Sequence, residues 1–179
     1  MRFLLAYLAL GLAATVALAG PDPINLSLTP DIALHGRTER IEGLTLSVWG
    51  ENPQTALSLG LANGSTGASA GLSWAWLLNY AEDYKGVHWA LINYTSHDFL
   101  GWQGGLVNYT ANSLKGLQTG AVNGAGRLTG LQFGFVNYAE DTDAGVQIGL
   151  VNFIRANQGW FTELPDELAP AMIFVNWRF

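Results

Sequence analysis

Cysteine is absent from this chain of 179 residues. Its absence excludes disulfide scaffolds, cysteine-based zinc sites and thiol catalysis. Charge is also scarce, because only 8 basic and 14 acidic residues are present and the formal net charge is -6. Nucleic acid is therefore excluded as a partner, since its phosphates need a basic protein surface.

Apolar residues nevertheless make up 49% of the chain, which excludes a disordered protein. Glycine occurs 22 times and tryptophan 7 times. Many glycines, many tryptophans and few charges are an unusual mixture for a soluble enzyme. The composition therefore indicates more about the architecture of the protein than about a catalytic activity.

The N-terminus has the composition of a secretory signal peptide. Arg2 precedes an apolar run over residues 3–16, and Ala-Leu-Ala at 17–19 supplies small residues at a cleavage position. The run is shorter than the roughly 17 residues that a spanning helix needs. We predict a signal peptide at 1–19 and one domain at 20–179, exported to the bacterial outer membrane or cell surface.

A repeat of about 15 residues dominates the predicted domain. Its unit reads Gly-apolar-Gln-x-Gly-x-Val-Asn-aromatic, most clearly at 130–138 and 145–153. We predict structural roles for the asparagine and the first glycine of each unit. The asparagines are Asn79, Asn93, Asn108, Asn123, Asn137 and Asn152, and the glycines are Gly86, Gly101, Gly116, Gly130 and Gly145.

Residues alternate in character along each unit, which predicts β-strands and an all-β fold. Two glycines per unit also disfavour a helix. Polar stretches such as 139–143 have turn composition. About ten strands are predicted, near residues 24–33, 41–50, 55–63, 69–80, 85–95, 100–110, 114–124, 128–139, 143–154 and 170–179.

Two all-β architectures can use such a repeat. In an antiparallel meander each unit is one strand, and the sheet can close into a small membrane β-barrel of about ten strands. In a β-solenoid each unit is one coil of about 15 residues, and like residues stack in parallel. The repeat asparagines would bond backbone groups at strand ends in the barrel and form a ladder in the solenoid.

Charge placement favours the barrel. The repeat units carry no charge at 71–80, 86–94, 101–109, 116–123, 130–138 and 145–153, and the charged residues lie in the connections between these units. Large apolar side chains facing lipid and small ones facing a lumen suit a membrane barrel. Its lumen would hold uncharged glutamines, which excludes an open ion channel. These are Gln103, Gln118, Gln132 and Gln147.

Two resemblances to known families add to this interpretation. Val175, Trp177 and Phe179 share one parity at the chain end, which resembles the terminal strand of bacterial outer-membrane β-barrels. That resemblance implies an insertion signal read by the outer-membrane insertion machinery. Residues 56–154 resemble bacterial surface-repeat proteins built on GLQ-x-G-x-[VIL]-N units, which implies a surface location and no established activity.

Catalytic and metal-binding patterns are weak in this sequence. His35, His88 and His97 are isolated, so we predict no metal site and no cofactor. Residues 96–98 read Ser-His-Asp, but neighbours on a strand point to opposite faces and cannot form a triad. We therefore predict no catalytic residue.

The preferred hypothesis is a small outer-membrane β-barrel with a structural or surface-interaction role, without enzymatic activity. Its expected partners are membrane lipid and the outer-membrane insertion machinery. One alternative is a secreted or surface β-solenoid that acts as an adhesion module. Another is a lipid-modifying barrel enzyme, which depends on residues 96–98 alone.

Overall fold

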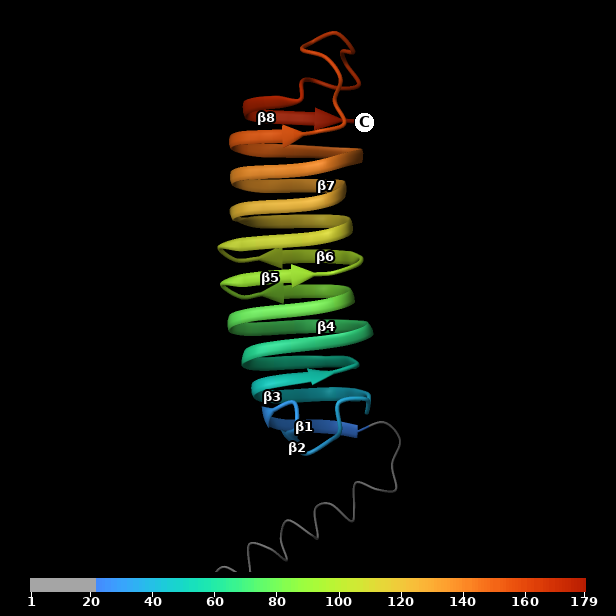
Figure 1. The fold of residues 1–179 in the computed structure, drawn as a ribbon, viewed down its shortest axis with the longest axis vertical. Helices are drawn as coiled ribbons and strands as arrows, with labels where there is room; N and C mark the ends of the chain where they lie inside the picture. Colours follow the sequence, from blue (N-terminus) through green and yellow to red (C-terminus); the bar gives the residue numbers. More distant parts are fainter. Residues whose placement is uncertain (1–21) are drawn as a thin grey trace, which may run out of the picture.

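The computed structural model describes residues 22–179, which wind into a rod of stacked coils (Figure 1). The predicted signal peptide at 1–19 lies outside the described residues. From Asn79 to Asn152, each coil brings the chain back to the same position of the rod after 14 or 15 residues. Over 22–179, no helix is long and apolar enough to cross a bilayer.

One sheet contains all the strands of the described part. Two of them, β4 and β7, pass through several coils without interruption (Figure 1). The strands are β1 (Asp22–Thr29), β2 (Ile32–Ala33), β3 (Ile41–Asn52), β4 (Gln54–Trp89), β5 (Ile92–Thr95), β6 (Phe99–Gly104), β7 (Val107–Ile154) and β8 (Ala171–Arg178).

Successive coils pair in parallel, and this register overturns the predicted barrel. Gly101 of β6 pairs with Gly86 of β4 and with Gly116 of β7. Asn93 of β5 pairs in parallel with Asn108 of β7. A meander would place neighbouring units antiparallel. The fold is therefore a β-solenoid with coils of about 15 residues, and the predicted antiparallel barrel of transmembrane strands is wrong.

The prediction of one straight strand per repeat unit is also wrong, because each unit bends within itself. Gln147 and Asn152 are both buried although they are five residues apart, an odd spacing that a straight strand cannot place on one face. The bend lies at Gly149, where an added Cβ would overlap the carbonyl oxygen of Gly134 in the preceding coil. The side chains on either side of it, Ile148 and Leu150, both point outward.

The interior of the rod is polar on one side and apolar on the other. Glutamines that were assigned to a barrel lumen form a dry ladder, in which Gln118 Nε2 donates to Gln103 Oε1 at 2.7 Å. The repeat asparagines form a second ladder, from Asn79 to Asn152. Opposite them, the buried apolar cluster contains Ala81, Tyr84, Phe99, Leu114, Ala125, Leu128 and Ala139.

Both ends of the rod carry a different strand arrangement (Figure 1). At the N-terminal end β2 pairs antiparallel with β1. At the C-terminal end β8 pairs antiparallel with the last coil of β7 after the loop at 155–170. These caps interrupt the parallel stacking and so protect a sheet edge that would otherwise accept another strand.

Candidate functional site

The rod has one charged edge, made by the turns that join successive coils. Arg127 Nη2 lies 3.2 Å from Asp141 Oδ2 of the next coil, and the Asp98 backbone N–H donates to Asp83 Oδ1 at 3.1 Å. These ion pairs and hydrogen bonds are exposed, so each contributes little to stability. The charged edge is a solvated surface that links neighbouring turns.

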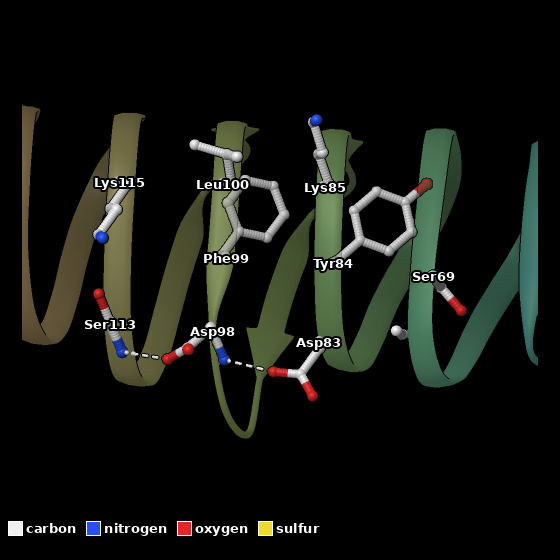
Figure 2. A pocket seen from close by; sticks show the side chains of 10 residues that line it. Ser69, Asp83, Tyr84, Lys85, Asp98, Phe99, Leu100, Ser113 and Lys115 are labelled. Atoms are coloured by element: carbon white, nitrogen blue, oxygen red, sulfur yellow. Dashed lines mark hydrogen bonds between the residues drawn. The ribbon is translucent and has the colours of Figure 1, made fainter.

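A small cleft of about 310 Å³ lies on the charged edge (Figure 2). The Tyr84 and Phe99 rings lie behind it, with centroids 5.9 Å apart and nearly parallel planes. Asp98 Oδ1 accepts hydrogen bonds from Asn112 Nδ2 and from the Ser113 backbone N–H. Both carboxylates that line the cleft, Asp83 and Asp98, are therefore already engaged in joining neighbouring turns.

The Ser-His-Asp sequence at 96–98 lies on this edge and forms no nucleophile relay. Ser96 Oγ donates to the Ala81 carbonyl oxygen at 3.3 Å. His97 Nδ1 faces Asp83 Oδ2 at 3.7 Å. A triad needs the serine hydroxyl to donate to the imidazole, and each of these side chains is directed to the preceding coil instead.

His88 is a buried imidazole without a hydrogen-bond partner. It is fully buried and pairs in register with Gln103, at the position where later coils place the ladder glutamine. Both of its ring nitrogens and the hydroxyl of nearby Tyr84 lack a partner. Burial lowers the pKa of His88 to about 3, because the imidazolium would lose its hydration.

We expect His88→Gln to stabilise the protein by about 1–3 kcal/mol, since it replaces an unsatisfied group by a ladder member. Gln118 donates to the carbonyl oxygen six residues later, Gly124. A glutamine at position 88 would reach the Tyr94 carbonyl in the same way and would accept from Gln103. Urea unfolding at pH 7 measures the change, and an equal or lower midpoint would contradict it.

The same substitution tests the pH dependence. Between the ordinary value of 6.5 and the folded value of about 3, only the unfolded chain takes up a proton at His88. The wild-type free energy of unfolding therefore falls with decreasing pH through this interval, by at most about 1.4 kcal/mol per pH unit from this group. In the His88→Gln variant the free energy of unfolding should fall less steeply with decreasing pH than in the wild type.

A second polar cluster fastens the N-terminal cap. His35 Nδ1 lies 3.1 Å from both Asp22 Oδ2 and Glu39 Oε2, and its Nε2 lies 3.1 Å from the Ile24 carbonyl oxygen. The three ligand atoms lie within 4.8 Å of one another and could surround a small cation. Glu39 is exposed, however, and tying the cap loop to β1 accounts for these contacts without an ion.

The opposite edge of the rod is apolar along its whole length, and we call it the apolar edge. A central column of small residues runs between two columns of outward side chains. The first column is Leu46, Leu59, Trp74, Trp89, Gly104, Thr119, Phe133 and Ile148. The second column is Val48, Leu61, Trp76, Leu91, Leu106, Ala121, Phe135 and Leu150.

The apolar edge is exposed and contains a notch. Trp76 is 72% exposed and Phe135 is 64% exposed. An open groove with a volume of about 730 Å³ runs along the edge from Trp89 to Phe174, and its small residues Gly105, Thr119, Gly120 and Ala121 form the notch. None of the residues in the two columns is charged. An uninterrupted apolar surface of this size marks an interaction site.

The structure places the predicted C-terminal insertion residues on the cap. Trp177 Nε1 donates to the Pro165 carbonyl oxygen at 2.9 Å, and the Phe179 N–H donates to the Asp166 carbonyl oxygen at 2.9 Å. Val175 pairs with Ile148 of the last β7 coil. These contacts hold the cap in place, and the insertion role stays a prediction.

No family model, curated protein or solved structure matches this chain. The repeat asparagines form an interior ladder, and the apolar edge is an extended exposed surface. The outward residues were visible in the sequence, but they were assigned to a lipid-facing barrel wall.

Proposed function

We propose that this chain is an exported β-solenoid that acts at the bacterial cell surface as a structural or interaction module, without catalysis. The apolar edge is its binding surface. The signal-peptide composition of residues 1–19 and the resemblance to surface-repeat proteins support export.

One observation carries the proposal: the apolar edge continues over every coil of the rod although it is open to solvent. Fully burying one large apolar side chain is worth about 1.5–3 kcal/mol. Several such side chains exposed in a row therefore favour association with an apolar partner. The geometry of residues 96–98 gives no comparable support to a lipid-modifying enzyme.

The test is the location of the full chain expressed in a bacterial host. We expect the wild type to be exported and to stay with the cell envelope after a wash in 1 M salt, because apolar contacts resist salt. Trp76→Gln combined with Phe135→Gln should release most of the protein into the medium. The matched control is Leu100→Gln, since Leu100 is 46% exposed but lies on the charged edge.

Two outcomes would contradict the proposal. One is recovery of the wild type in the cytoplasm with its first residues intact. The other is an equal envelope-bound fraction for the wild type and the Trp76→Gln, Phe135→Gln variant. A correct fold of every variant is checked by far-ultraviolet circular dichroism.

A further inference from the structure

The occupant of the apolar edge can be inferred from the distribution of bulk along it. We call each pass of the chain across this edge a rung. The three tryptophans lie on adjacent rungs on one side of the midpoint of the rod, at positions 74, 76 and 89. On the other side of the midpoint Trp89 and Trp102 lie over Gly104 of their own chain, and the next rung carries the small residues Thr119 and Ala121. The edge therefore has a protrusion at the rung of Trp74 and Trp76 and a notch at the rung of Thr119 and Ala121.

Protrusion and notch are related by a two-fold axis. The axis lies in the plane of contact between the two copies and is perpendicular to the rod. Along the rod it lies between the rungs of Trp89 and Gly104, which pair in register. Applied to a second copy laid face to face, it sets Trp74 over the partner's Thr119 and Trp76 over the partner's Ala121.

The same operation gives full overlap of the two rods. Four rungs lie on each side of the axis between residues 46–48 and 148–150, so these eight rungs of the two copies overlap completely. Leu61 then faces Phe135 of the partner subunit. A parallel pair would set each rung on itself, which brings tryptophan against tryptophan and leaves the notch empty.

The exposed area is sufficient for a stable pair. Aromatic side chains bury about 150–250 Å² each, and five of them lie on the edge with roughly half of their surface exposed. With the aliphatic residues included, each copy offers on the order of 1,000 Å², above the roughly 800 Å² per partner of a standard interface. The charged edges of both copies face away from the contact, so the net charge of -6 per chain causes little repulsion across it.

We propose that two copies of this chain pair antiparallel along the apolar edge, with the tryptophans of each copy seated in the notch of the other. The inference rests on the proposed function and names the partner of its binding surface. In this arrangement both copies use the same surface for the contact, as a two-fold interface requires. A fluid lipid surface would need no such match between protrusion and notch.

The first experiment fills the notch. Analytical ultracentrifugation of the exported protein should give twice the chain mass for the wild type. Ala121→Trp should raise the dimer dissociation constant by roughly 30-fold or more, because two tryptophans would then compete for one space. Trp76→Ala combined with Ala121→Trp exchanges protrusion and notch and should restore the dimer. Ala121→Trp enlarges the apolar surface, so it should instead strengthen binding to lipid.

The second experiment determines whether the two copies run antiparallel. Because the chain has no cysteine, the introduced thiols can form disulfides only with each other. Leu61→Cys with Phe135→Cys in one chain should give a disulfide-linked dimer on a non-reducing gel. The two positions lie five rungs apart, about 24 Å at 4.8 Å per rung, so they cannot link within one chain. Each single cysteine variant should stay uncrosslinked, and a dimer from Leu61→Cys alone would overturn the antiparallel arrangement.

The remaining outcomes separate this inference from the proposed function. A wild-type monomer that binds phosphatidylcholine vesicles, and binds them more tightly with Ala121→Trp, overturns the dimer but keeps the apolar edge as the binding surface. A monomer that binds neither itself nor vesicles overturns both. A dimer that survives Ala121→Trp unchanged overturns the proposed interface.

Discussion

Gly101→Ala should lower the free energy of unfolding by more than about 3 kcal/mol or prevent folding altogether. Gly101 has a φ of +138°, a conformation that residues with a side chain rarely adopt. An added Cβ would also overlap the carbonyl oxygen of Gly86 in the preceding coil. Because that oxygen belongs to the backbone of a packed coil, neither group can move without breaking the stacking.

Gly67→Ala is the matched control. Gly67 also has a positive φ, of +56°, but no atom lies within 4 Å of the position that a Cβ would take. Gly67→Ala should lower the free energy of unfolding only by the conformational penalty of about 1–2 kcal/mol. Urea unfolding of both variants measures the difference. Equal losses for the two variants would show that close stacking at Gly101 contributes nothing.

The sequence predicted the period and the structural residues of this fold, because both follow from side-chain chemistry at fixed spacing. Gly86, Gly101 and Gly116 recur where adjacent coils approach too closely for a Cβ. The repeat does not encode whether neighbouring units run parallel or antiparallel. That choice was made from the absence of charge on the outward residues, on the assumption that a solenoid charges its exposed face. Trp76 and Phe135 contradict this assumption.

One signal in the sequence would have corrected the strand prediction. In the clear units the glutamine and the asparagine are five residues apart, as Gln132 and Asn137 are. Two uncharged amides that both repeat in every unit are expected to form two interior ladders, and an odd spacing then requires a bend between them. The second glycine, Gly134 in this unit, marks the bend.

Other features could not be predicted from the repeat. Asp22, His35 and Glu39 meet because the cap loop folds back on β1, and no periodicity specifies that path. The unpartnered His88 is an exception to the ladder that follows from the packing of Tyr84 and Phe99 around it. The complementarity of the apolar edge depends on the order of large and small residues across coils, which becomes readable once the register is known.

Asn108→Ala is the second substitution expected to have a large effect. It should lower the free energy of unfolding by about 3–5 kcal/mol. Asn108 Oδ1 accepts from Asn93 Nδ2 at 2.8 Å, and its Nδ2 donates to Asn123 Oδ1 at 2.9 Å. Its Nδ2 also donates to the Thr119 carbonyl oxygen at 3.1 Å. Alanine removes these bonds and leaves Asn123 Oδ1 buried without its donor, which adds a desolvation cost to the lost hydrogen bonds.

Asn112→Ala is the matched control, because Asn112 is an asparagine that lies outside the ladder. Asn112 also donates to a side chain of the preceding coil, Asp98, at 2.7 Å, but the bond is exposed to water. Its loss should cost less than about 0.5 kcal/mol, since water replaces the partner. Thermal and urea unfolding of both variants give the comparison. Because the ladder runs without a break from Asn79 to Asn152, similar small losses at 108 and 112 would mean that backbone stacking alone holds the coils together.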